Sequence, residues 1–131
     1  MTFTQSNRLK VWSPAVYLLR SLTNRNRGAR AYYMHSVLHD WPDEVCAKIL
    51  AQITSAMKPG YSKLLINENV IPPTNADWQA TALDIMMLTL LSSRERTEED
   101  WNNVLSGAGL KICKIWSAAN GVESLIECEL V

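Results

Sequence analysis

An amphipathic helix between two short apolar segments constrains the fold of this chain more than any other feature. Residues 31–38 and 63–70 are rich in apolar side chains and have the length of buried strands. Between them, apolar residues recur at helical spacing on one face: Val45, Cys46, Ile49, Leu50, Ile53 and Met57. Pro42 suits the first turn of this helix, and Gly60 suits its C-cap. The pattern predicts a β-α-β unit, which joins two parallel strands by a right-handed crossover.

The rest of the chain extends this unit into an α/β fold. Further helices are expected over residues 77–91 and 97–106, and further strands over residues 110–116 and 123–130. Thr97 and Asp100 form a capping pair at the head of the second of these helices. The apolar centre of residues 63–70 is continuous, as in strands that helices cover on both faces. We therefore expect a doubly wound, mostly parallel sheet with one reversed strand in a C-terminal hairpin.

Charge and composition bear on the partners of the chain. Its formal net charge is +0, which gives no electrostatic reason to expect nucleic acid or an anionic membrane as a partner. Cationic side chains do collect in the first thirty residues, but no aromatic residues interleave with them. This favours a solvated N-terminal segment over a nucleic-acid-binding arm. The same segment has no regular pattern and is expected to be a loop or a short helix.

Cysteine use and apolar runs bear on the compartment. Cys46, Cys113 and Cys128 are widely spaced in apolar surroundings and are expected to be reduced core residues. The only two histidines lie close together in sequence, so no metal site is expected. The N-terminus lacks the apolar region of a signal peptide, and the longest apolar run, residues 80–91, is too short to span a membrane. These features predict a cytoplasmic protein.

His39 is the candidate general base. It lies where the first strand of the β-α-β unit gives way to the helix, at the edge of a parallel sheet where ligands bind. Histidine titrates near neutral pH, as a general base requires. Glu68 ends the next strand and is therefore expected at the same edge, where a carboxylate on the second ring nitrogen would fix the tautomer. Taken alone, a histidine at such a position is more often structural than catalytic.

Several motifs, in one register, resemble those of a known family. They are Gly-Ala-Arg-Ala-Tyr-Tyr at 28–33, Leu-His-Asp-Trp-Pro-Asp-Glu at 38–44, Lys-Leu-Leu-Ile-Asn-Glu at 63–68, Arg-Glu-Arg-Thr-Glu-Glu at 94–99 and Gly-Ala-Gly-Leu at 107–110. Over residues 28–131 the chain resembles the class I, S-adenosyl-methionine-dependent O-methyltransferases of the plant caffeic-acid type and their fungal relatives. Residues 1–27 match nothing in that family and are treated as an unassigned leader.

The resemblance implies a reaction and a set of residues for it. The reaction is transfer of a methyl group from S-adenosyl-methionine to a hydroxyl of a small, aromatic acceptor. His39 takes the position of the general base, and Glu68 and Glu95 take the positions of the acids that flank it. A phenol is largely protonated at neutral pH, so a base assists as the new bond forms.

The resemblance also assigns residues to the two ligands. Trp41 lies near the adenine of the cofactor in the family, and Asp40 is given a supporting role beside it. His35 stands where relatives often carry a lysine or arginine near the cofactor, so this sequence departs from the family there. Met86 and Met87 fall on a helix that lines the acceptor pocket in relatives, although methionines on such a helix are core residues by default.

One half of the family's catalytic domain has no counterpart in this sequence. Its five glycines never form the glycine-rich turn of the cofactor site, and the helical dimerisation domain of the family is missing. Half of a doubly wound sheet leaves a strand edge and two helix-binding faces uncovered. The chain is therefore expected to be a fragment, a degenerate remnant, or a protein completed by a second copy or another chain; the first is favoured. A non-catalytic binding or interaction module is the alternative function.

Overall fold

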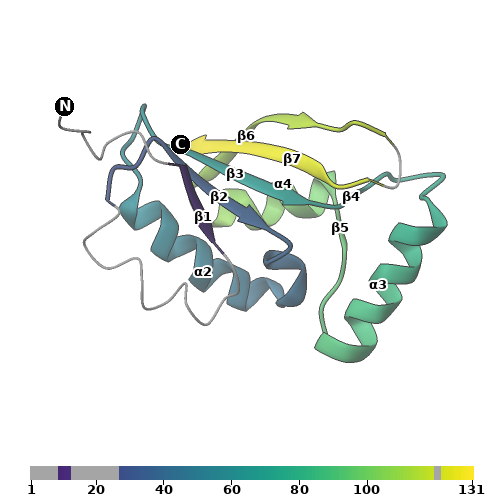
Figure 1. Cartoon of the computed structure of the whole chain (residues 1–131). Helices are drawn as coiled ribbons and strands as arrows, with labels where there is room; N and C mark the ends of the chain where they lie inside the picture. Colours follow the sequence, from purple (N-terminus) through teal and green to yellow (C-terminus); the bar gives the residue numbers. More distant parts are fainter. Residues whose placement is uncertain (1–8, 13–26, 120–121) are drawn as a thin grey trace.

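The computed structural model describes residues 9–12, 27–119 and 122–131, and a five-stranded mixed sheet forms its centre. The strands, in spatial order, are β1 (Leu9–Trp12), β2 (Ala31–His35), β3 (Lys63–Glu68), β7 (Ser124–Leu130) and β6 (Leu110–Trp116). The first three run parallel, whereas β7 is antiparallel to both β3 and β6 (Figure 1). The expected α/β sheet with one reversed strand in a C-terminal hairpin is confirmed.

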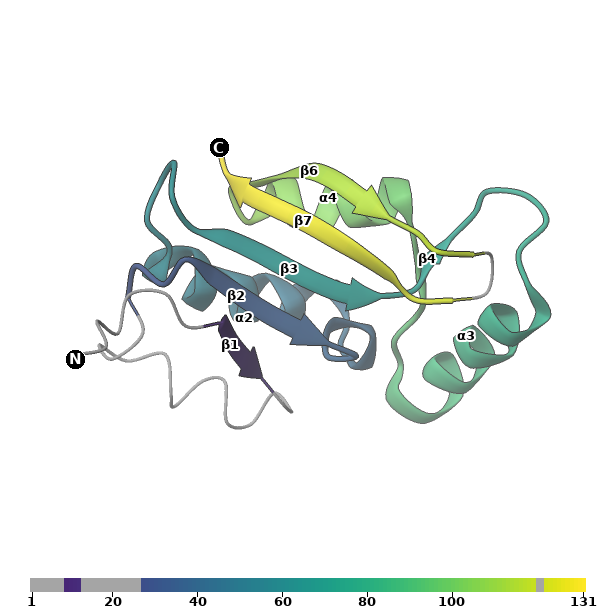
Figure 2. The same ribbon diagram turned by 45° about the horizontal axis from the view of Figure 1, so that its top comes forward.

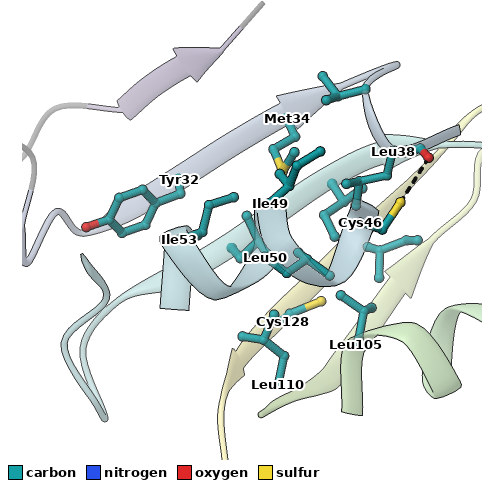
Figure 3. Close-up of a cluster of buried hydrophobic side chains, with 14 of the residues drawn as sticks. Tyr32, Met34, Leu38, Cys46, Ile49, Leu50, Ile53, Leu105, Leu110 and Cys128 are labelled. Atoms are coloured by element: carbon teal, nitrogen blue, oxygen red, sulfur yellow. Dashed lines mark hydrogen bonds between the residues drawn. The ribbon is translucent and has the colours of Figure 1, made fainter. Parts of the chain in front are cut away.

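Two helices cover one face of this sheet. They are α2 (Asp43–Ala56), which connects β2 to β3, and α4 (Glu98–Gly107), which precedes β6. Both contribute to a single apolar core against the buried face of β2, β3 and β7 (Figure 3). The predicted capping box is present, because Thr97 and Asp100 exchange side-chain and main-chain hydrogen bonds at the head of α4. This core holds β2 and β3 against the two helices and so fixes the positions of the strand ends, where the candidate site lies.

The opposite face of the sheet carries no helix within the described parts of the chain. Along β3, Leu64 and Ile66 are fully buried on the helix side, whereas Leu65 is only half-buried on the open side. The expectation that helices cover both faces of this strand is therefore not met within the described residues. The open face also carries Cys113, which is exposed and not the core residue that was predicted, since its strand position points away from α4; Cys46 and Cys128 are buried as expected.

The helix α3 (Trp78–Leu91) lies beyond the edge of the sheet at which β2 and β3 end (Figures 1 and 2). Asp77 caps it by accepting a hydrogen bond from the main-chain N–H of Gln79. Ala80 and Met87 are its only buried apolar residues, although most residues of the helix are apolar. No helix in the described parts of the chain combines the length and apolarity needed to cross a bilayer.

The structure also differs from the sequence-based expectations at several junctions. The first predicted strand ends at His35, and a short 3-10 turn, η2 (Leu38–Asp40), follows it. Pro42 is the N-cap of α2 and not a residue of its first turn. Residues 9–12, expected in a loop or short helix, form β1 by pairing with β2, whereas residues 27–30 form a turn and residues 1–8 and 13–26 lie outside the described residues. A small parallel sheet of β4 (Val70–Ile71) and β5 (Arg96–Thr97) was not expected.

Candidate active site

His39 lies in η2, at the carboxyl edge of β2 and β3, with 14% of its side chain exposed. Its Nδ1 is 2.9 Å from Oε1 of Glu95, which reaches it from the segment between α3 and α4. Its Nε2 is 3.3 Å from Oδ1 of Asp40. The carboxylate of Glu95 is an acceptor only, so Nδ1 carries the proton in that hydrogen bond. In the neutral ring the lone pair is then on Nε2, the tautomer that a general base needs.

Glu68 is buried at the end of β3 and makes different contacts from those expected. Its Oε1 accepts hydrogen bonds from the main-chain N–H groups of Val37, at 2.8 Å, and Leu38, at 2.7 Å. Its Oε2 is 4.0 Å from Nδ1 of His39. Strand order places Glu68 beside the histidine as predicted, but Glu95 makes the hydrogen bond to the ring. Since both N–H groups of the turn face Glu68, this carboxylate shapes the backbone that presents His39.

These carboxylates change how His39 titrates. The hydrogen bond that His39 donates to Glu95 raises the pKa of His39 to about 8, with further contributions from the negative charges of Glu68 and Asp40, while burial acts in the opposite direction. Burial raises the pKa of Glu68 above its ordinary value. A base whose pKa lies near neutrality, with a carboxylate stabilising its protonated form, is suited to accepting a proton from a hydroxyl group.

Two residues that sequence reasoning missed fix the backbone around His39. Arg96 is completely buried, and its guanidinium donates hydrogen bonds to the carbonyls of Leu38 and Trp41 and to the carboxylate of Asp43. Ser93 donates its hydroxyl hydrogen to the carbonyl of His39. In the sequence, Arg96 lies in a charged run that reads as a solvated loop, so only its fully buried environment reveals its role.

The residues expected near the ligands occupy different environments. His35 ends β2, with 51% of its side chain exposed, and its Nε2 is 2.7 Å from the carboxylate of Glu123. Trp41 packs against the apolar core, and Asp40 is partly exposed beside His39. Met87 is buried, whereas Met86 is 49% exposed on α3. The structure therefore places Asp40 beside His39, whereas His35 pairs with Glu123. Of the two methionines, only Met86 is exposed.

Comparison with known protein families identifies the family of this chain. Residues 23–111 match a family model described as an O-methyltransferase domain. The chain belongs to this O-methyltransferase domain family. The resemblance deduced from the motifs is thereby confirmed, and S-adenosyl-methionine is the methyl donor of the family.

Individual relatives agree with the family assignment. O-methyltransferase mfmE of Annulohypoxylon moriforme is 46% identical over 104 residues, which make up 79% of this chain and 26% of that protein. O-methyltransferase ATR12 of Stachybotrys chlorohalonatus is 50% identical over 103 residues, with the same shares of the two chains. The chain thus spans about a quarter of the length of these O-methyltransferase relatives.

Solved structures support the same fold. LepI in complex with SAM matches with a TM-score of 0.75 at 30% identity, over 80% of this chain and 27% of that chain. The mitomycin 7-O-methyltransferase MmcR matches with a TM-score of 0.76 at 29% identity, over 84% of this chain and 32% of that chain. The chain therefore shares the α/β fold of part of these solved structures.

Proposed function

We propose that residues 28–131 form the C-terminal part of a catalytic domain that methylates a hydroxyl of a small, aromatic acceptor, with His39 as general base. The observation that carries this proposal is the hydrogen bond between His39 and Glu95 at the carboxyl edge of the sheet. That edge is where α/β proteins bind their ligands. The family membership supplies the reaction class, and the geometry supplies a base held in the required tautomer.

The proposed role of His39 is to accept the acceptor's hydroxyl proton on Nε2. S-adenosyl-methionine supplies an activated methyl group when it is bound. As that methyl group is transferred to the acceptor oxygen, the hydroxyl proton would pass to Nε2 of His39. Glu95 stabilises the imidazolium through Nδ1, and Glu68 holds the turn that carries the ring. Because the pKa of His39 is raised to about 8, we expect the rate to increase with pH through that value.

The described residues fit one side of the cofactor. Asp40 offers a partly exposed carboxylate beside the base, and Trp41 offers an aromatic side chain at the head of α2. His35 contributes only if its contact with Glu123 opens or is extended by the ligand. The sequence contains no glycine-rich turn of the cofactor-binding type, so these three residues form part of a site and not a whole one.

The acceptor is assigned to the side of the site that α3 borders. Met86 is half-exposed on this helix and is suited to contacting an aromatic ring, since methionine packs adaptably and makes favourable sulfur–aromatic contacts. Met87 is buried and supports the helix from the inside. A natural-product hydroxyl is the expected target, because relatives such as MmcR are named for methylating such compounds.

The expected partners follow from the same features. A complementing chain would supply a glycine-rich turn for the cofactor, and a homodimer would form through the large exposed apolar surface of α3. The balanced charge of the sequence gives no support for a nucleic-acid or membrane partner. The buried, unpaired thiols of Cys46 and Cys128 fit a reducing compartment such as the cytoplasm.

Calorimetric titration with S-adenosyl-methionine tests whether the chain works alone. Measurable binding, together with methylation of phenolic acceptors, supports the proposed enzyme. His39→Ala is then expected to abolish turnover while leaving cofactor affinity nearly unchanged, and Gln52→Ala, on the exposed side of α2, serves as the matched control. Unchanged turnover in His39→Ala would refute the assignment of the base. Absence of binding would favour the alternative, a non-catalytic methyltransferase-like module.

A further inference from the structure

Asp84 is the only charged residue in α3, a helix of predominantly apolar residues. It lies in the middle of the helix and is half-buried. A carboxylate in such surroundings requires a hydrogen-bond partner to compensate for lost hydration. Its partner is the main-chain N–H of Glu95, which donates to Oδ1 at 2.7 Å.

The segment that contains Glu95 is tied to α3 and to the base at defined points. Ser92 adopts a left-handed conformation that ends the helix, and the N–H of Ser93 donates to the carbonyl of Met87. The hydroxyl of Ser93 then donates to the carbonyl of His39, and Glu95 accepts from its ring. Asp84 therefore fixes the backbone of the residue whose side chain contacts the base.

We propose that Asp84 is a positioning residue that holds the carboxylate of Glu95 against Nδ1 of His39, a role that rests on the proposed function of His39. The side chain of Glu95 is long, so its reach to the ring depends on where its own main chain is held. The hydrogen bond from its N–H to Asp84 fixes the main chain of Glu95 where its carboxylate reaches Nδ1 of His39. The same contact explains why a helix so apolar retains a single carboxylate.

The environment of His39 sets the size of the effect that loss of Asp84 should have. Three acids face the ring: Glu95 from the segment after α3, Glu68 from the end of β3, and Asp40 from η2 itself. Displacing Glu95 leaves the other two in place. Loss of the Asp84 contact is therefore expected to lower the pKa of His39 from about 8 toward its ordinary value of 6.5, because the hydrogen bond to Glu95 is the largest cause of the raised pKa.

NMR titration of the histidine ring protons tests this proposal without cofactor or acceptor. The His39 signals are assigned with His39→Gln, and His35 serves as an internal reference. Asp84→Ala is expected to lower the midpoint of His39, whereas Asp84→Asn keeps an accepting oxygen and should stay near the unmodified value. Thr89→Ala is the matched control, because Thr89 is an exposed polar residue of α3 that contacts only its own helix.

The outcomes separate this role from others. An unchanged midpoint in Asp84→Ala, or equal decreases in Asp84→Ala and Asp84→Asn, would overturn the proposal. If Asp84→Ala does not fold, hydrogen exchange of the Glu95 amide in the unmodified chain decides: protection supports the contact, and rapid exchange overturns it. Failure of methyl transfer with an intact Asp84 effect would instead refute only the proposed function.

Discussion

Two of the acids around His39 contact different atoms and therefore have different effects on it. Glu95 contacts the ring nitrogen, while Glu68 contacts the main chain on the preceding residues. The sequence predicts that both acids lie near His39, because Glu68 ends a predicted strand and Glu95 lies in a motif that resembles one of the family. It does not predict which of them reaches Nδ1, since that choice depends on where the turn of η2 directs its N–H groups.

The titration of His39 makes a prediction about stability. The folded pKa of about 8 lies above the unfolded value of 6.5, so the folded state binds the proton more tightly. The stabilisation is fully present below the unfolded pKa and is lost as pH rises through the folded pKa. We expect the chain to lose about 2 kcal/mol of unfolding free energy across this interval from His39 alone.

Urea unfolding of the chain and of His39→Gln, at a pH below 6.5 and at a pH above 8, measures this contribution. The difference between the two proteins should be larger at the lower pH. Parallel pH dependences in the two proteins would contradict the raised pKa and would weaken the case for the Glu95 contact. Glu95→Gln, which keeps an acceptor but removes the charge, should give an intermediate result.

At the scale of elements, Arg96 joins three segments that the sequence alone does not connect. Its backbone belongs to β5, and its guanidinium contacts the carbonyls of η2 and the N-terminal carboxylate of α2. It also lies 5.3 Å from the ring centroid of Trp101 in α4. The sequence predicts each of these helices from local periodicity, but a single buried side chain determines how they meet.

Arg96→Met is predicted to destabilise the chain by about 3 kcal/mol, because the carbonyls of Leu38 and Trp41 each lose a charged donor and Asp43 loses its buried cationic partner. Arg94→Met is the matched control. Arg94 also pairs with Asp43, but its side chain is 52% exposed, so its loss should cost less than about 1 kcal/mol. Equal destabilisation of the two variants in urea unfolding would show that burial does not decide the contribution.

The elements themselves were predicted unequally. The β-α-β unit, α3, α4 and the hairpin follow from local periodicity, capping residues and loop length, although both strands of the β-α-β unit end earlier than predicted, at His35 and Glu68. The pairing of β1 with β2 and of β4 with β5 could not be predicted, because these strands are two to four residues long and form only through partners distant in sequence. Short strands of this kind depend on tertiary contacts and carry little signal of their own.

At the scale of the whole molecule, the two faces of the sheet differ in chemistry. The face covered by α2 and α4 is apolar, whereas the open side of β3, β7 and β6 carries a network of ion pairs. Lys63 contacts Glu127 and Glu129, and Lys111 contacts Glu129 as well. This side is compatible with water. Among the described residues, most of the large apolar side chains that are exposed lie on α3 instead.

The apolar surface of α3 predicts how the isolated chain behaves in solution. Trp78, Leu88 and Leu90 are each between 65% and 74% exposed on this helix. Exposed apolar surface of this extent favours association, because burying apolar surface contributes a favourable free energy of about 25 cal/mol per Å². We therefore expect the chain to bind a hydrophobic dye and to self-associate as its concentration rises.

The variant Leu88→Gln/Leu90→Gln tests this expectation. It should reduce both dye fluorescence and the apparent mass in sedimentation, and Met87, which anchors the helix from its buried side, is left unchanged. Val131→Gln is the matched control, since Val131 is 88% exposed but lies at the end of β7, away from α3. A reduction of equal size in the control would mean that α3 is not the associating surface, and a monomer at all concentrations would mean that the exposed helix does not drive association at all.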